Sequence, residues 1–318
     1  MLKLKSLTQA HQDKHFKLLK TRFDTELPKA VAAVGRGPYD DQLIDHMKVS
    51  LKTIILGTPA QIEAFADAVT SRFSPFSQYA AKHRKGTDAK DDVHRNTLAI
   101  IHTCFDYDWF SDQTKEWGAY PLVEAYGLRI CPYCQANHVN FHVEKVKGQR
   151  GAEAFKMRPP LDHYLPKSVY PYLAVSLSNL VPSCAQCNSG VKTANDPLGK
   201  GFAHPLDETA IKVRFSTKGT IRQKLNGPVQ VDEVVITLKG EDAVSTRHVN
   251  EFRLQERYGW YRHEIKDLID RDDQHRDLNR KMQGVIPREL YVLGFLEAQA
   301  EERSLGFCLR DVYKELDP

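Results

Sequence analysis

The chain has 318 residues, of which 41% are hydrophobic and 27% charged, and its formal net charge at pH 7 is only +4. This length and composition can bury one sizeable core or two modest ones. Six cysteines are too few for a disulfide scaffold, and no apolar run of 18 residues or signal-peptide core is present, which disfavours a secreted or membrane-spanning protein. We therefore expect a soluble, cytoplasmic protein.

Residues 1–115 form the first of three predicted regions and have a helical pattern. The charged segment of residues 84–92 contains Gly86 and is typical of an exposed loop between helices. Apolar stripes of this kind usually pack in a core, so we expect a helical scaffold that could also dock a partner. The stripes recur at helical spacing in the sets Phe16, Leu19, Phe23 and Leu27, then Ile62, Phe65, Ala66, Val69 and Phe73 after Thr58-Pro59, then Leu98, Ile101, Cys104 and Phe105.

Two Cys-x-x-Cys pairs are the main feature of residues 116–208, the second region. They are Cys131/Cys134 and Cys184/Cys187. Four thiolates from two such pairs can hold Zn²⁺ in tetrahedral geometry, and the ion closes a loop that core burial alone would not stabilise. The spacing therefore predicts one structural zinc ion.

Three polar residues accompany the cysteines. Asp162 and His163 lie between the two pairs, and Asn188 directly follows the last cysteine. A carboxylate and an amide oxygen are ligands suited to a magnesium-type ion. A neighbouring imidazole can accept a proton from water near neutral pH. The sequence thus implies a second metal ion with a different role.

The order of these motifs resembles that of the zinc-stapled HNH endonucleases, which carry a ββα-metal core. The resemblance covers about residues 125–208. Asn188 occupies the third position of the family's His-Asn-His motif, where the family has a histidine. The sequence around Asp162 and the later segment of residues 202–208 look like those of the HNH subunits of bacterial antiphage systems of the Septu and retron-associated kind. The matching strings are Cys131-Pro132-Tyr133-Cys134, Leu161-Asp162-His163-Tyr164-Leu165-Pro166-Lys167-Ser168, Ser178-Asn179-Leu180-Val181-Pro182 and Cys184-x-x-Cys187-Asn188-x-x-x-Lys192.

The resemblance implies a role for each matching residue. Asp162 and Asn188 would hold a catalytic Mg²⁺ or Mn²⁺, with His204 as a further candidate ligand. His163 would be the general base, and Asn179 or a backbone carbonyl would orient its other nitrogen. Lys192, four residues after Asn188, is a candidate for contact with the scissile phosphate or, with equal weight, a solvated lysine on an exposed helix.

The implied function is metal-dependent hydrolysis of DNA phosphodiester bonds. Residues 129–208 contain nine Lys/Arg against six Asp/Glu, a modest surplus that suits a phosphate-binding surface. No base-reading element is visible, so we expect low sequence specificity. The resemblance to defence subunits implies an effector nuclease of a bacterial antiphage system, controlled by an ATPase or another regulatory protein.

Other interpretations account for fewer of these residues. The string Cys131-Pro132-Tyr133-Cys134 is also a glutaredoxin-type redox motif, but such a fold does not use a second pair. A zinc deaminase would use His142 and Glu144, but the first cysteine pair would then have no role in the site. A zinc knuckle that binds nucleic acid or protein without catalysis is the main alternative. In that case Asp162-His163 is a polar turn, and Asn188 caps a helix over residues 189–194.

The predicted fold class is α+β, with a ββα-metal core and a four-cysteine zinc site between two other regions. Alternation at Val139, Phe141 and Val143 predicts the first strand of a hairpin, a turn at residues 148–151, and Leu161-Asp162-His163 on the second strand. A helix after Asn188 would complete the core.

The third region, residues 209–318, is predicted to contain a small β element followed by helices. Alternation occurs over residues 211–215 and 234–238, and helical patterns cover residues 249–271 and 287–300 and the surroundings of Asp311. Cys104 and Cys308 have no cysteine partner at close spacing, so we expect both to be buried as small hydrophobic residues.

Overall fold

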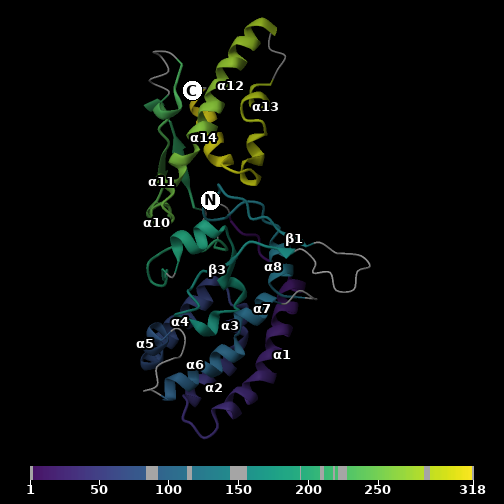
Figure 1. Cartoon of the computed structure of the whole chain (residues 1–318), viewed down its shortest axis with the longest axis vertical. Coiled ribbons are helices and arrows are strands. Elements are labelled where there is room, and N and C mark those ends of the chain that lie inside the picture. The colour runs from purple at the N-terminus through teal and green to yellow at the C-terminus, as the bar shows by residue number, and fades with distance from the viewer. Residues whose placement is uncertain are drawn as a thin grey trace, which may run out of the picture.

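The computed structural model describes residues 3–83, 92–112, 117–143, 156–193, 195–207, 211–217, 219–220, 228–282 and 287–316. Within these ranges the protein is mostly helical and contains three two-stranded antiparallel sheets, which confirms the α+β class. Helices α1 to α6 lie at one end of the molecule and α12 to α14 at the other (Figure 1). Strand β3 lies between these two groups of helices (Figure 1).

The N-terminal helices form as their apolar spacing predicts. Leu19, Phe23, Phe65 and Leu98 are buried in the core. Thr58 begins its helix with a capping box that also uses Gln61. Residues 84–91 of the predicted loop lie outside the described ranges. The helices are α1 (Gln9–Val34), α2 (Asp41–Val49), α3 (Leu51–Leu56), α4 (Pro59–Arg72), α5 (Ser74–Lys82), α6 (Asp92–Cys104), α7 (Tyr107–Asp112) and α8 (Ala119–Tyr126).

The hairpins of the middle region differ from the prediction. Strand β1 (His142–Val143) pairs with β2 (Lys156–Met157), and β3 (Leu161–His163) pairs with β4 (Leu180–Pro182). The predicted pairing of Val139–Val143 with Leu161–His163 is therefore wrong. Val139 instead donates its N–H to the Arg129 carbonyl, because the turn through the first cysteine pair brings these two segments together. The predicted turn at residues 148–151 lies outside the described ranges.

The segment after β4 is a π-helix, Gln186–Lys192, rather than an α-helix that begins after Asn188. Asn188 lies inside it, so the interpretation of Asn188 as a helix cap is wrong. Its N–H donates to the Cys184 carbonyl, and its own carbonyl accepts from the Thr193 N–H five residues later. Single π turns of this kind often occur at functional sites.

The C-terminal region contains the small β element, formed by β5 (Val213–Ser216) and β6 (Thr237–Gly240). The helix predicted over residues 249–271 is divided, because Arg253 adopts a left-handed conformation with φ of 50°. The helix predicted over residues 287–300 is also shorter and is followed by Gly294 with φ of 74°. The helices are α10 (Ala243–Glu251), α11 (Leu254–Tyr258), α12 (Arg262–Met282), α13 (Arg288–Val292) and α14 (Gly306–Leu316), with 3₁₀ turns at Gly259–Tyr261 and Glu297–Glu302.

The long helices of the described ranges are amphipathic rather than uniformly apolar. α12, with 21 residues, contains a dense series of charged side chains. Among all the described residues, no helix is both long enough and apolar enough to cross a membrane.

Candidate functional site

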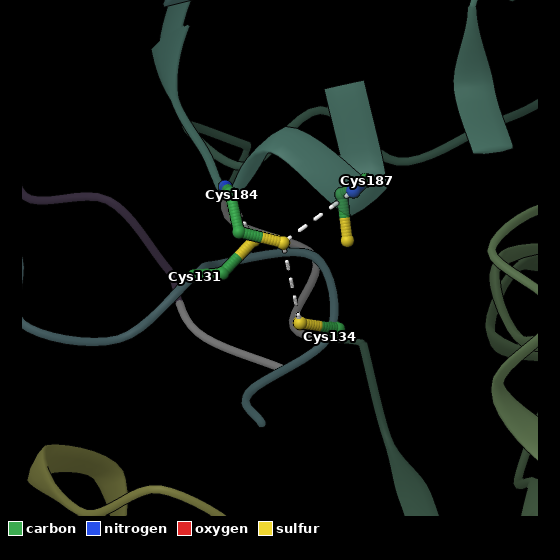
Figure 2. A group of neighbouring side chains, drawn as sticks. All are labelled: Cys131, Cys134, Cys184 and Cys187. Atoms are coloured by element: carbon green, nitrogen blue, oxygen red, sulfur yellow. Dashed lines mark hydrogen bonds between the residues drawn. The ribbon is translucent and has the colours of Figure 1, made fainter. Parts of the chain in front are cut away.

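The two Cys-x-x-Cys pairs come together at one buried point. The Sγ atoms of Cys131, Cys134, Cys184 and Cys187 all lie within 4.8 Å of one another, and the four side chains converge in Figure 2. Cys134 Sγ and Cys184 Sγ are 3.9 Å apart, close to the edge of about 3.8 Å in a tetrahedron with zinc–sulfur bonds of about 2.3 Å. The cluster therefore fits a metal ion such as zinc. Cys104 and Cys308 are buried elsewhere as free cysteines, as predicted.

Polar groups around the cluster donate hydrogen bonds to three of its four sulfur atoms. The Cys184 N–H lies 3.4 Å from Cys131 Sγ, and the Cys187 N–H lies 3.4 Å from Cys184 Sγ. Asn137 Nδ2 donates to Cys184 Sγ at 3.3 Å, and a guanidinium nitrogen of Arg257 donates to Cys187 Sγ at 3.3 Å. Four thiolates around a bound dication would carry excess negative charge, which the Arg257 cation would offset.

Asp162 lies at the centre of β3 and is 1% exposed. Its Oδ2 accepts a hydrogen bond of 2.6 Å from the Tyr133 hydroxyl, and its Oδ1 accepts one of 3.1 Å from Lys192 Nζ. Burial raises the pKa of Asp162 above its usual value, although the Lys192 charge and the Tyr133 hydrogen bond act in the opposite direction. Both carboxylate oxygens are thus held by protein groups.

Lys192 differs from both sequence-based expectations. It is 4% exposed, and its ammonium bonds to the His163 carbonyl at 2.8 Å as well as to Asp162. It is neither a solvated lysine nor available to a phosphate in this arrangement. The physical reason is the burial of Asp162, because a carboxylate removed from water requires a paired charge.

The imidazole of His163 is held by a backbone carbonyl. Its Nε2 lies 2.9 Å from the Ala174 oxygen. A carbonyl only accepts, so Nε2 carries the proton and Nδ1 is an acceptor. Burial, followed by the charge of Lys167, lowers the pKa of His163 to about 3. The ring is therefore neutral at pH 7.

Asn179 acts on the loop between β3 and β4 rather than on the His163 ring. Its Oδ1 accepts from the Leu165 N–H at 2.6 Å, and its Nδ2 donates to the Leu165 and Leu173 carbonyls, each at 3.0 Å. These bonds fix the loop that presents the Ala174 carbonyl. Asn179 and a backbone carbonyl were the two predicted orienting groups for His163, and it is the backbone carbonyl, that of Ala174, that contacts the ring.

Asp162, His163 and Asn188 line one cleft of about 500 Å³. Arg158 and Lys167 add positive charge to its lining. The structure therefore brings together three of the residues selected from the sequence as the catalytic site.

The chain matches no protein-family model, no curated protein and no solved structure. The resemblance to HNH endonucleases therefore stays a prediction from the sequence motifs.

His204 is not brought to this cleft. It is buried, its Nδ1 accepts from the Leu206 N–H at 3.0 Å, and its ring packs edge-on against Tyr164 at 4.3 Å between centroids. Burial is the main cause that lowers its pKa to about 3. Its place in the structure is that of a packed core histidine. Glu208, at the end of the same sequence string, lies outside the described residues.

Several cleft residues were missed in the sequence. Tyr107 and Ser111 come from α7, in the region predicted to be a scaffold, and Arg158 donates to Ser111 Oγ at 2.5 Å. The Tyr107 ring also packs edge-on against His163, 4.5 Å between centroids. No local motif marks these residues, because they reach the cleft only through the tertiary fold. Tyr133, which bonds to Asp162 but does not line the cleft, was also missed, although it is an aromatic residue inside a Cys-x-x-Cys turn.

Proposed function

We propose that this protein is a metal-dependent HNH-type endonuclease that hydrolyses DNA phosphodiester bonds with low sequence specificity. The observation that supports this proposal most is that Asp162, His163 and Asn188 line a single cleft. The succession of two short antiparallel strands, β3 and β4, and the helical segment Gln186–Lys192 also supports the proposal.

The donor groups in the cleft fit a hard divalent cation. The Asp162 carboxylate and the Asn188 side-chain amide would hold Mg²⁺ or Mn²⁺, provided that the Lys192 ammonium leaves Asp162 Oδ1. When bound, such an ion neutralises charge that develops on a phosphate in the transition state. In this scheme the four cysteines hold zinc as a structural ion and take no part in the chemistry.

The chain's own residues supply proton transfer and phosphate binding in this proposal. His163 Nδ1 accepts the proton of the attacking water, while the Ala174 carbonyl holds the opposite edge of the ring. Arg158 and Lys167 in the cleft lining attract the phosphodiester. A phosphate bound beside His163 offsets the lysine charges that lower its pKa, so it strengthens the base when substrate is present.

The cellular role that we propose follows from the sequence resemblance alone. It is that of a cytoplasmic effector nuclease in a bacterial antiphage system, with an ATPase or other regulatory protein as its partner. A nuclease with little sequence preference would damage its own host's DNA. Control by a partner is therefore part of the proposal, and the N-terminal helices offer a docking region.

A second candidate function is a zinc module that binds nucleic acid or protein without catalysis. The buried contacts of Asp162 favour it, because Tyr133 and Lys192 already satisfy both carboxylate oxygens. In that case the Asp162–Lys192 pair is a structural ion pair, and the four-cysteine cluster is the only metal site that the protein needs.

One experiment separates these functions. The purified chain is incubated with plasmid, linear single-stranded DNA and RNA, in Mg²⁺ or Mn²⁺ and in EDTA, beside the variant His163→Ala. Metal-dependent DNA cleavage that disappears in the variant supports the nuclease. Calorimetric titration with Mn²⁺ tests the same site and does not require the proposed regulatory protein. A zinc-loaded wild type that binds no Mn²⁺ and cleaves no nucleic acid would favour the zinc module.

A further inference from the structure

Tyr133 lies between the cysteines of the first pair and connects the four-cysteine cluster to Asp162. Its side chain is buried, with the residue 2% exposed, and its hydroxyl donates to Asp162 Oδ2 at 2.6 Å. Cys131 and Cys134 on either side fix its backbone to the cluster. One side chain therefore spans the distance between the two candidate metal sites.

The C-terminal region holds both the ring and the backbone of Tyr133. The Phe252 ring, at the end of α10, stacks on the Tyr133 ring with centroids 4.5 Å apart and an interplanar angle of 17°. The His248 ring, also on α10, donates from Nε2 to the Tyr133 carbonyl at 2.7 Å. The orientation of the Tyr133 ring thus depends on a helix more than 100 residues away in the sequence.

The next three carbonyls of this turn are held by the same region. The Cys134 carbonyl accepts from the Tyr258 hydroxyl at 2.8 Å, and the Gln135 carbonyl accepts from the Leu305 N–H at 2.9 Å. The Ala136 carbonyl accepts from Ser304 Oγ. Four successive carbonyls, from residue 133 to residue 136, therefore bond to residues 248–305. The turn cannot move independently of the C-terminal region without breaking these bonds.

We propose that Tyr133 is a positioning residue for Asp162, and that Phe252 of the C-terminal region sets the orientation of Tyr133. The inference rests on the proposed function, because it takes Asp162 as a ligand of the divalent cation. A hydrogen bond to one oxygen of a metal-binding carboxylate fixes the direction of the other oxygen and so prepares the site for the ion. Movement of the C-terminal region relative to the turn of residues 131–136 would change the affinity of the cleft for the cation, although the C-terminal region does not contact the cation.

The variant Tyr133→Phe removes the hydroxyl and keeps the stacked ring. We expect it to weaken Mn²⁺ binding by about tenfold, the lower end of the effect of losing such a partner. Calorimetric titration of the full-length, zinc-loaded chain measures the affinity. Electron paramagnetic resonance of the bound Mn²⁺ reports its surroundings, and we expect a broadened signal. Excess Mn²⁺ should restore the cleavage rate, which it could not do for a damaged fold.

Tyr258→Phe is the matched control, because it also removes one buried tyrosine hydroxyl that bonds to this turn, but this hydroxyl does not contact Asp162. We expect it to bind Mn²⁺ as the wild type does, and both variants to keep zinc. The variant Phe252→Leu removes the stacked ring and should weaken Mn²⁺ binding a few-fold.

Three results would overturn the inference. If Tyr133→Phe binds Mn²⁺ with wild-type affinity while the wild type binds it, Tyr133 does not position Asp162, and the proposed function stands. Equal weakening in Tyr133→Phe and Tyr258→Phe would show a general loosening of the turn instead. A zinc-loaded wild type that binds no Mn²⁺ would overturn the proposed function itself, and the inference with it.

Discussion

Lys192 Nζ and Asp162 Oδ1 form a buried ion pair at 3.1 Å, with side chains that are 5% and 2% exposed. In the proposed function, a divalent cation would bind at this same oxygen. Removal of one partner from a buried pair leaves an uncompensated charge, which is strongly destabilising. Loss of Lys192 would therefore leave the Asp162 charge unpaired, and in the proposed function the Lys192 ammonium would compete with the divalent cation for Asp162.

The variant Lys192→Met tests this competition. Without divalent metal we expect the free energy of unfolding to fall by about 3 kcal/mol, because Asp162 loses its paired charge. We also expect tighter Mn²⁺ binding than in the wild type and recovery of stability when Mn²⁺ is added. Thermal unfolding and calorimetric titration measure these changes, with the exposed Lys200→Met as the control. Weaker Mn²⁺ binding in Lys192→Met would show that Lys192 supports the site instead of competing for it.

The second prediction concerns the four-cysteine site. Replacement of Cys187 by Ser should release zinc and destabilise the middle of the chain, because structural zinc contributes folding free energy directly. Cys308→Ser is the control, since Cys308 is equally buried but lies outside the cluster. Metal analysis should find about one zinc per chain in the wild type and the control, and much less in Cys187→Ser. A wild type purified without chelator that contains no zinc would contradict this assignment.

The sequence was most informative where the chemistry is local. The spacing within each cysteine pair and the adjacency of Asp162 and His163 could be identified without a fold, and the apolar stripes of the N-terminal helices likewise depend on short-range periodicity. Strand pairing could not be predicted from the local sequence. Val139 pairs back toward Arg129, and Asp162 lies opposite Val181, because the cysteine turns determine which segments meet.

The contacts that define the site come from residues far apart in the sequence. Lys192 was expected either to contact the scissile phosphate or to be solvated on an exposed helix, and only the burial of Asp162, 30 residues earlier, explains why its ammonium is inside. His204, a further candidate ligand from its sequence spacing, packs against Tyr164 and is not among the residues that line the cleft. The contact between Phe252 and Tyr133 has no sequence signal at all, because it joins two regions that were predicted separately.

The third prediction concerns the dependence of stability on pH. Burial lowers the pKa of His15 and of His248 to about 4 in the folded chain, against about 6.5 when unfolded. Between these values the unfolded state binds more protons, so stability is fully present above pH 6.5 and falls as the pH drops toward 4. The slope is at most about 1.4 kcal/mol per pH unit for each histidine.

The variant His248→Gln isolates one of these contributions. Its amide can still donate to the Tyr133 carbonyl, but it does not titrate. Urea unfolding at pH 7 and pH 5 should show a smaller loss of stability in this variant than in the wild type. The same substitution at the exposed His138 is the matched control. An unchanged difference between the two pH values in His248→Gln would exclude His248 as a source of the acid sensitivity.

The last prediction concerns His163, whose Nδ1 is the proposed proton acceptor. His163→Ala leaves the four cysteines, Asp162 and the cations Arg158 and Lys167 in place, so DNA binding should persist. Cleavage should fall by about 10²- to 10⁴-fold, the usual contribution of general-base catalysis. Gel-shift and plasmid-nicking assays on the same preparation measure the two effects separately. Added imidazole should restore part of the rate in His163→Ala, because the lost group only accepts a proton, and should not restore Asp162→Ala. If His163→Ala nicks plasmid at the wild-type rate, and EDTA abolishes nicking in both proteins, another group must be the base, and the role proposed here for the Ala174-bound imidazole is wrong.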